Sequence, residues 1–292
     1  MTTQVAPDLS IHNDAFNFIQ ELAAELSSRK VDLPSFPDIA LRVRKVLADE
    51  NVSPEQVVRV VGSDPTLAAR LLQIANSAAL NVSGRAITDL RTAVARLGFN
   101  MIRSAAIAFA MSQMQKADEL KGLEKPLNDL WQRSAEVAAM SHVVARRLTK
   151  VNPDTALLTG LLHGLGELYI LTRASRHPAL FNDQSSYLAI VRDWHTNVAK
   201  ALLENWEMAD EIIQAVGDYE DHQRTHTGPT DLCDVLTVAH LLVTFSEFPD
   251  TLEMNMQGVA ACHRMKLDKA AYDNLIAESA SDITALKQAL GV

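Results

Sequence analysis

Cysteine is scarce in this chain: the two cysteines, Cys233 and Cys262, stand apart and form no CxxC pair. Two isolated cysteines in a chain that is not exported are typical of reduced core residues rather than of a disulfide. The N-terminus also lacks a basic region followed by an apolar stretch, so the sequence shows no secretory signal. These absences make a cytoplasmic location the default expectation.

Aromatic residues, glycine and proline are also few, with 5% aromatics, 11 glycines and 10 prolines in 292 residues. Alanine and leucine are abundant instead, which favours helices over sheets. The longest uninterrupted apolar run, residues 105–111, is far shorter than the roughly 18 residues that span a bilayer. At 48% hydrophobic and 22% charged residues, the chain has the composition of a globular protein with one large domain or two small ones.

Basic residues are outnumbered, because 27 Lys and Arg stand against 36 Asp and Glu, for a net charge of −9. The imbalance is uneven: residues 29–103 carry eleven bases and seven acids, whereas residues 104–292 carry sixteen bases and twenty-five acids. The overall acidity argues against a dedicated nucleic-acid-binding protein. The mildly basic segment keeps nucleotide or nucleic-acid binding open as an alternative.

Helix start signals recur along the chain. Ser53 precedes a proline and is followed three residues later by Gln56, which is the pattern of a capping box. Asp64 repeats the signal before a second proline, and Thr88 and Asp154 are further candidates for helix starts. No period-2 strand of any length is present, so we predict an all-α protein with helices packed on helices. Helices are predicted at about residues 14–26, 38–48, 54–62, 66–80, 89–97, 100–114, 127–148, 154–170, 185–205, 209–219, 231–245 and 268–290.

Four elements in the first third of the chain match one family pattern in order and spacing. They are the proline pair of Leu33-Pro-Ser-Phe-Pro37, the start signal Asp64-Pro-Thr-Leu-Ala68, the helix Arg70-Leu-Leu-Gln-Ile-Ala-Asn-Ser77 and the turn Ala93-Val-Ala-Arg-Leu-Gly98. In this combination the sequence resembles the front half of the HDOD domain, a relative of the HD phosphohydrolases. The resemblance implies a multi-helix, HD-like globular bundle with an N-terminal helical subdomain.

A second stretch resembles the HD superfamily itself. Leu130-Trp-Gln-Arg-Ser134 lies where a helix of that superfamily carries a histidine, and Thr159-Gly-Leu-Leu-His-Gly-Leu-Gly-Glu-Leu168 resembles the turn with the His-Asp pair. We therefore expect an N-terminal helix at 1–28, an HDOD domain at 29–225 and a C-terminal helical extension at 226–292. Within the domain, we expect an N-terminal half at 29–115 and an HD-like half at 126–225.

The residues that bind metals in active HD proteins are mostly absent at the matching positions. Arg133 stands where the first histidine is expected, and the His-Asp pair is His163-Gly164, without its carboxylate. Tyr219-Glu220 holds the position of a later histidine pair, and His240 holds that of the late aspartate. Arginine repels a divalent cation, and the remaining side chains do not supply the ligand set that metal-dependent hydrolysis requires.

The resemblance therefore implies a non-catalytic regulatory module of bacterial signal transduction. It would need no cofactor, and its partner would be an unidentified signalling protein or small ligand. The candidate ligand or partner groove, expected between the two helical halves, comprises Arg133, His163, Tyr219, Glu220 and His240. The alternative from another class is a metal-dependent phosphohydrolase with an unusual ligand set, in which His163 would be a metal ligand.

Arg85, Arg91, Arg96 and Arg103 lie within nineteen residues and are candidates for phosphate contacts with a nucleotide or nucleic acid. Solvated helix faces and internal ion pairs are the more frequent explanation, because no aromatic stacking residue is interleaved beyond Phe99.

The histidines also carry a functional and a structural interpretation. His163 is either a core histidine bonded to the backbone or a residual ligand. His222 and His226 have the i,i+4 spacing of a metal pair but lie in a polar stretch that is typical of a loop. His142 and His195 are expected at the surface or its boundary.

Overall fold

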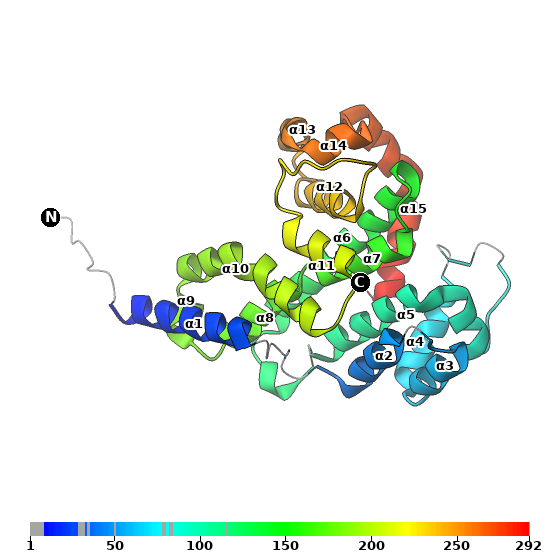
Figure 1. The fold of residues 1–292 in the computed structure, drawn as a ribbon, viewed down its shortest axis with the longest axis horizontal. Coiled ribbons are helices and arrows are strands. Elements are labelled where there is room, and N and C mark those ends of the chain that lie inside the picture. Colours follow the sequence, from blue (N-terminus) through cyan, green and yellow to red (C-terminus); the bar gives the residue numbers. More distant parts are fainter. Residues whose placement is uncertain are drawn as a thin grey trace.

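The computed structural model describes residues 9–28, 33, 36–49, 51–77, 80–81, 84–114 and 116–291, except for the side chains of residues 9–13, 119 and 182. Over these ranges the chain forms helices joined by turns and contains no β-strand, so the predicted all-α class is confirmed (Figure 1). Aliphatic side chains from the N-terminal to the C-terminal helix form one continuous core cluster.

The N-terminal half packs three short helices against one long, kinked helix. Both predicted start signals with proline are confirmed. Ser53 accepts a hydrogen bond from the N–H of Gln56, whose side chain accepts one from the Ser53 N–H at 2.7 Å. Asp64 Oδ1 accepts the first free N–H groups of its helix at 2.9 Å. The helices are α2 (Asp38–Ala48), α3 (Pro54–Gly62), α4 (Pro65–Ala75) and α5 (Leu90–Met114).

A kink divides α5, as predicted, at Gly98, whose φ of 72° lies in the region that favours glycine. The start of the helix differs from the prediction. Asp89, not Thr88, accepts the hydrogen bond of an early helical N–H, that of Thr92, at 2.8 Å. Beyond the kink the helix is almost wholly buried, and it forms the centre of the N-terminal half.

α4 ends at Ala75, about a turn before the predicted end, and the side chain of Asn76 explains why. Its Nδ2 donates to the carbonyl oxygens of Leu72 and Ile87, and its Oδ1 accepts the N–H of Ile87, each at 2.8 Å. These bonds tie the end of α4 to a segment eleven residues later instead of continuing the helix. The asparagine of the HDOD-like motif therefore has a structural role.

Asn76→Ala is expected to lower the free energy of unfolding by roughly 1–2 kcal/mol, because three hydrogen bonds are lost at a partly exposed site. Urea unfolding followed by circular dichroism measures the loss. Asn255→Ala is the matched control, since Asn255 bonds only the Thr251 carbonyl of its own helix. Equal losses in the two variants would contradict this role.

The HD-like half contains two helices where one was predicted from 154 to 170. The break falls at His163-Gly164, and Asn152 rather than Asp154 caps the first of the two helices. The break places His163 at a helix end, where its side chain reaches backbone of the preceding turn. The elements are α6 (Glu124–Leu148), α7 (Pro153–Leu162), α8 (Leu165–Ala174), α9 (Pro178–Asn182), α10 (Gln184–Asn205) and α11 (Asp210–Asp218), with the short 3-10 turn η1 (Asp118–Leu120) before them.

The N-terminal helix α1 (Leu9–Ser28) begins before its predicted start and packs mainly on α9 and α10 of the HD-like half (Figure 1). It buries Phe18 and Leu22. Its Glu25 accepts a hydrogen bond from the Tyr169 hydroxyl and pairs with Arg173 at 3.2 Å. Apolar and ionic contacts together therefore hold α1 against the far half of the domain.

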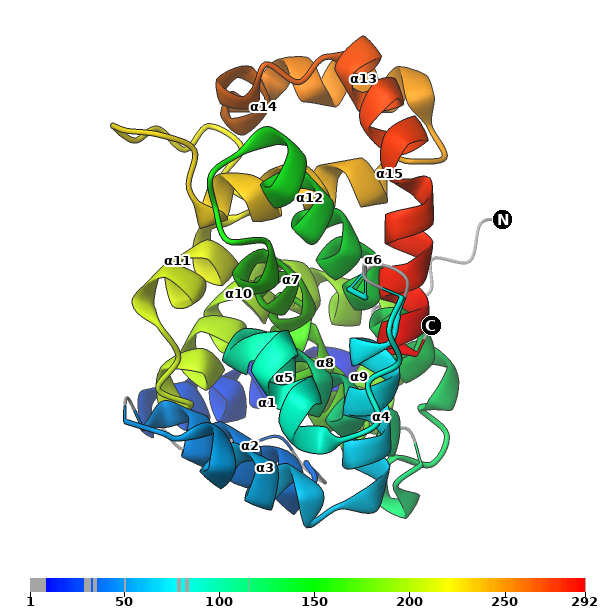
Figure 2. The same ribbon diagram turned by 90° about the vertical axis from the view of Figure 1, so that its right-hand side faces the viewer.

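The residues beyond 225 pack back onto the domain. The predicted helices at 231–245 and 268–290 are present, and the shorter helices between them were not predicted. α12 packs against α6, α7 and α11, and α15 runs along α6 and reaches α4 (Figure 2). These helices are α12 (Leu232–Thr244), α13 (Pro249–Gly258), α14 (Ala260–Met265) and α15 (Lys269–Leu290).

Two stretches, Leu90–Met114 and Pro153–Ala174, are long and apolar enough by composition to cross a membrane. In the fold, 67% and 94% of their apolar windows are buried against other helices. That burial is what core helices of a globular fold show, and here both stretches pack at the centre of their halves.

Candidate functional site

His163 follows the last turn of α7 inside the HD-like half, with 4% of its surface exposed. Its Nδ1 lies 2.5 Å from the carbonyl oxygen of Gly160 and therefore carries a proton, because a carbonyl only accepts hydrogen bonds. Burial, together with the nearby His240, lowers the pKa of His163 to about 3. The ring is thus neutral at neutral pH, and the structural interpretation of a backbone-bonded core histidine fits this geometry.

Two other predicted site residues surround the His163 ring. The ring of Tyr219, at the end of α11, lies 5.7 Å from His163 and 5.0 Å from His240 between centroids, and the two histidine rings are 5.7 Å apart. All three contacts are edge-on, as aromatic rings prefer. Burial lowers the pKa of His240 to about 4 and raises that of Tyr219. The three rings form an uncharged cluster at neutral pH.

His195 of α10 joins this cluster, although the sequence argument placed it near the surface. Its Nδ1 lies 2.8 Å from the Val191 carbonyl oxygen, and its Nε2 lies 3.0 Å from the Tyr219 hydroxyl and 3.3 Å from Glu220 Oε1. Burial acts to lower the pKa of His195, but the hydrogen bond and charge of Glu220 raise it overall. The same pairing lowers the pKa of Glu220. Glu220 therefore favours the protonated form of His195, and the two groups form the polar edge of the cluster.

The expectation that His142 and His195 lie at the surface or its boundary is wrong, since both are buried, with 6% and 8% of their surface exposed. His142 Nδ1 lies 3.2 Å from the Pro153 carbonyl oxygen, which satisfies the buried ring. For His195, the helical period of the sequence could have predicted its burial. It lies four residues after Val191 and three before Val198, on the apolar stripe of α10. Residues on such a stripe face the core whatever their type.

Arg133 of α6 lies at the more exposed side of the cluster, where it pairs with Glu167 of α8. The two side chains are 44% and 31% exposed, so the pair itself contributes on the order of 1 kcal/mol or less. The guanidinium charge also adds to burial in lowering the pKa of His163 and of His240. The structure thus brings all five predicted groove residues together, with His195 and Glu167 added.

This cluster does not fit a divalent metal. Arg133 is a cation where a ligand is needed, and Gly164 has no carboxylate. A Cβ added at Gly164 would lie 2.4 Å from Ser134 Oγ and 3.3 Å from Leu130 Cδ1, so there is little room for a larger side chain at this position. Within the described part of the chain, the one group of three possible ligand residues with mutually close ligand atoms lies elsewhere.

That other group consists of His226, Asp231 and Asp234, in the loop before α12 and in its first turn. Its carboxylates are already engaged. Arg264 bonds both Asp234 oxygens, at 2.5 and 3.1 Å, and Arg224 bonds both Asp231 oxygens, at 2.6 and 3.1 Å. Two guanidinium groups therefore neutralise the two carboxylates, and the network fixes the loop that precedes α12.

His222 lies in the same loop, where its carbonyl oxygen accepts the N–H of Ala260 at 2.9 Å. The segment is not helical. The i,i+4 spacing of His222 and His226 therefore does not place the two rings on one helix face, and His226 instead contacts Asp234 at 2.9 Å.

The four candidate phosphate-binding arginines differ in burial and in partners. Arg91 is exposed and pairs with Glu55 at 3.4 Å, and Arg85 and Arg96 are also exposed. Arg103 lies beyond the Gly98 kink and is half-buried. Phosphate contact by the three exposed arginines stays a prediction. Arg103 instead lies half-buried between the two halves of the domain.

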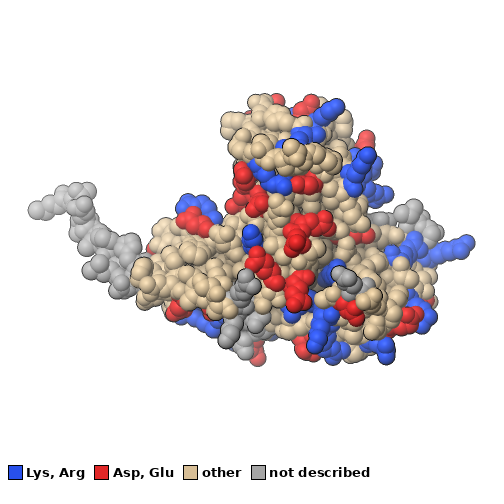
Figure 3. Space-filling view, viewed as in Figure 1, with Lys and Arg blue, Asp and Glu red and all other residues tan. Residues whose placement is uncertain are grey.

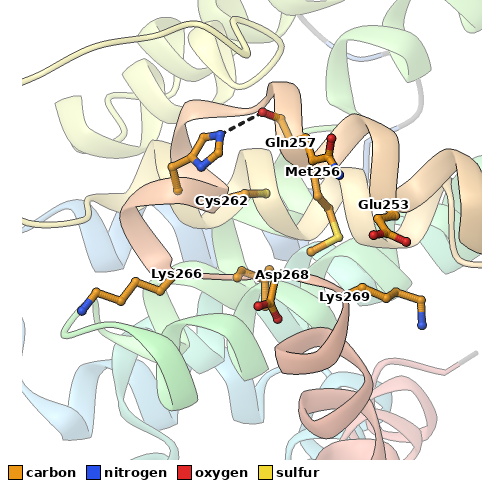
Figure 4. A pocket seen from close by; sticks show the side chains of 9 residues that line it. Glu253, Met256, Gln257, Cys262, Lys266, Asp268 and Lys269 are labelled. Carbon is orange, nitrogen blue, oxygen red and sulfur yellow. Dashed lines mark hydrogen bonds between the residues drawn. The ribbon is translucent and has the colours of Figure 1, made fainter.

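A separate pocket of about 280 Å³ lies among α13, α14 and the start of α15 (Figure 4). Lys266 and Lys269 lie on either side of Asp268, and the sulfur-bearing side chains of Met256 and Cys262 lie above it in this view. Asp268 caps α15 by accepting the Ala271 N–H at 2.8 Å, and Lys269 pairs with Asp273 at 2.5 Å. These charges serve the local helix ends, and the pocket is not part of the His163 cluster.

Residues 33–222, more than half of the chain, match the family model of the HDOD domain. The chain belongs to the HDOD family. The resemblance drawn from the proline pair, the start signal at Asp64 and the histidine-glycine turn is thereby confirmed. In this HDOD protein, an arginine and a glycine stand at two of the positions where the sequence comparison with HD proteins expects metal ligands, Arg133 and Gly164.

Solved structures similar to this HDOD protein share its fold at low identity. A Shewanella amazonensis protein, whose name proposes metal-dependent phosphohydrolase activity, is 23% identical with a TM-score of 0.75 and covers 95% of this chain and 99% of its own. A Geobacter sulfurreducens HDOD domain protein of unknown function is 23% identical with a TM-score of 0.64, over 96% and 98% of the two chains. A Marinobacter aquaeolei protein named for signal transduction is 21% identical with a TM-score of 0.58, over 99% and 68%.

Among curated proteins, an uncharacterised Treponema pallidum protein is 22% identical over 242 residues. The match covers 77% of this chain but 45% of that protein, so this chain spans about half the length of the curated relative that it matches. At these identities, the comparisons show the family and the fold, and they assign no activity.

Proposed function

We propose that this HDOD protein is a non-catalytic regulatory module of bacterial signal transduction, which works by binding rather than by hydrolysis. Membership of the HDOD family supports the proposal, as does a structural neighbour whose name refers to signal transduction. The observation that carries it is the HD-like cluster, where an arginine stands at one expected ligand position and a glycine at another, and where Arg133, His163 and Glu220 bond to neighbouring protein groups.

Three side chains of the cluster already have internal partners. His163 bonds Gly160, His195 bonds Val191 and Glu220, and Arg133 pairs with Glu167. A hydrolytic metal site keeps an open coordination position for water and converging nitrogen and carboxylate ligands. A cluster closed by its own hydrogen bonds supports retention of the fold for binding, with the metal chemistry lost.

The metal content of the protein tests this proposal. After growth in medium supplemented with manganese, iron and zinc, we expect less than about 0.1 equivalent of each metal, because the described residues of the cluster place no three ligand atoms of His, Cys, Asp or Glu close together. Bis(p-nitrophenyl) phosphate should not be hydrolysed. Inductively coupled plasma mass spectrometry measures the metal content. Absorbance at about 405 nm measures hydrolysis, because the released nitrophenolate absorbs there.

One or two equivalents of metal, lost in His163→Ala and kept in His263→Ala, would contradict the proposal. His263 is the control because it is exposed on α14, in the C-terminal pocket. That result would instead support a phosphohydrolase with an unusual ligand set.

A role for the cluster in partner binding has its own test. In a bacterial lysate, proteins captured by the wild-type chain should be reduced for the double variant Arg133→Ala, His163→Ala. Retention of every captured protein by the double variant would remove the cluster from the binding surface and leave the rest of the domain as the candidate.

A further inference from the structure

A hollow of about 400 Å³ lies between the two halves of the domain. Its walls come from α2 and α5 on one side and from α7, α11 and the turn after α10 on the other. Its volume lies within the range of small-molecule pockets, which often form where two structural units meet. None of the five HD-like groove residues lines it. The lining residues are Arg44, Leu47, Ala48, Asp49, Val52, Phe99, Asn100, Arg103, Thr155, Trp206, Glu207, Met208, Ala209, Glu211 and Ile212.

Arg103 is the unusual member of this wall. Its guanidinium donates to the Leu47 carbonyl oxygen and, at 3.0 Å, to Asn100 Oδ1, which uses two of its five N–H donors. Both acceptors are neutral, and no described carboxylate forms an ion pair with it at 4.0 Å or less. Burial lowers the pKa of Arg103, and no neighbouring charge offsets that effect. Buried charges are normally paired, whereas this half-buried cation has only neutral hydrogen-bond partners among the described residues.

The inner wall around Arg103 is fixed in place. Asn100 Nδ2 donates to Thr155 Oγ1 at 2.8 Å and so joins α5 to α7 across the two halves. The Trp206 ring lies 5.2 Å from the Phe36 ring, and the Arg44 guanidinium lies 5.4 Å from its centroid. A rigid wall with an aromatic side and a cation is suited to a small organic anion, since little has to be reordered on binding.

The mouth of the hollow is acidic and so has a charge opposite to that of Arg103. Asp49, Glu207 and Glu211 line the hollow and are exposed, whereas Arg103 is half-buried. Acidic side chains gather near the middle of the face shown in Figure 3. Three carboxylates at the mouth disfavour ligands with several negative charges, such as polyphosphates. They favour a ligand that presents a cation toward solvent.

We propose that this hollow binds a small organic zwitterion, whose carboxylate pairs with Arg103 and whose ammonium group lies among Asp49, Glu207 and Glu211. The carboxylate supplies the counter-charge that the half-buried guanidinium lacks, and the bond is charge-assisted. The ammonium group forms solvent-exposed ion pairs at the mouth. Such pairs contribute more to the choice of ligand than to the binding affinity. This inference does not depend on the proposed function, because the hollow and the HD-like cluster share no residue.

Three probes of matched length separate the two charges: 6-aminohexanoate carries both, hexanoate only the carboxylate, and hexylamine only the ammonium. By saturation-transfer NMR titration of the intact chain, we expect 6-aminohexanoate to bind most tightly. Hexanoate should bind about threefold more weakly, as an exposed ion pair is lost, and hexylamine at least about tenfold more weakly, as the charge-assisted bond is lost. Failure of all three probes to bind, or equal binding of hexylamine, would overturn the proposal.

Variants connect this binding to the named residues. Arg103→Met should weaken 6-aminohexanoate at least about tenfold, while Arg91→Met, an exposed arginine before the kink, should leave binding unchanged. Glu211 is exposed at the mouth, so Glu211→Gln should leave the stability of the fold unchanged. It should weaken 6-aminohexanoate about threefold without weakening hexanoate. Equal binding by Arg103→Met and Arg91→Met, or equal effects of Glu211→Gln on both probes, would overturn the assignment.

Discussion

Between pH 8 and pH 5, the free energy of unfolding is expected to fall by about 3 to 4 kcal/mol, because two buried histidines resist protonation. The pKa values of His163 and His240 are lowered to about 3 and about 4, against 6.5 in the unfolded chain. As the pH falls below 6.5, the unfolded chain binds these protons first. Their contribution to stability is therefore complete above pH 6.5 and is lost progressively as the pH falls to about 4 for His240 and about 3 for His163.

The charged groups around the two rings set the sign and limit the size of this effect. Arg133 acts in the same direction as burial at both rings, whereas Glu220 partly opposes it at His240. His195 acts oppositely, since its pKa is raised and its contribution is lost as the pH rises. The net loss on acidification is thus somewhat below the sum for His163 and His240, and it still approaches the total stability of a typical domain.

Urea unfolding at pH 8 and pH 5 measures this dependence. His163→Asn and His240→Asn should each remove about half of the difference between the two pH values, about 2 kcal/mol each. His263→Asn, an exposed histidine on α14, should leave the difference unchanged. A wild-type stability that is flat from pH 8 to pH 5 would mean that neither ring is held neutral by burial.

Gly166→Ala is expected to lower the free energy of unfolding by about 3 kcal/mol or more, the largest effect of any single substitution proposed. A Cβ at Gly166 would lie 1.8 Å from the carbonyl oxygen of His195 and 2.9 Å from the N atom of Ala199. Both atoms are backbone of α10, so the clash cannot be relieved by rotating a side chain. α8 and α10 would have to move apart.

The same substitution tests how the cluster is positioned, because the clash falls on the backbone of His195. Partial unfolding or a shift of the histidine Cε1–H NMR signals should accompany the loss of stability. Gly258→Ala is the control: nothing lies within 4 Å of its added Cβ, so stability should change by less than about 0.5 kcal/mol. Equal stability of the two variants would show that the helices do not approach as closely as Gly166 indicates.

The glycines of the HD-like turn therefore have a packing role that a motif alone does not show. A Cβ at Gly160 would lie 2.5 Å from Ala138 Cα, where α7 crosses α6, and Gly166 marks the crossing of α8 and α10. Gly164, between them, stands where an aspartate would supply a metal ligand. The sequence resembled a catalytic motif with one residue missing, and the structure adds that its glycines allow helices to touch.

Local signals in the sequence predicted most of the helices, because capping and proline geometry act within a few residues. The Ser53 capping box and the Asp64 start were correct, and so was the break at Gly98. Errors arose where a side chain bonds a distant or neighbouring segment. Asn76 ends α4 early by bonding Ile87, and the turn at His163-Gly164 divides a predicted helix in two.

The sequence by itself determined the all-α class, the HDOD family and the absence of metal ligands at the positions of Arg133 and Gly164, since each depends on residue identity and spacing. Only the tertiary structure decided that His195 joins His163, Tyr219 and His240, and that Arg103 lines a hollow without a paired carboxylate. Those properties depend on contacts between helices far apart in the chain. Burial and the distance between charges, which set a pKa or leave a cation unpaired, exist only once the helices have packed.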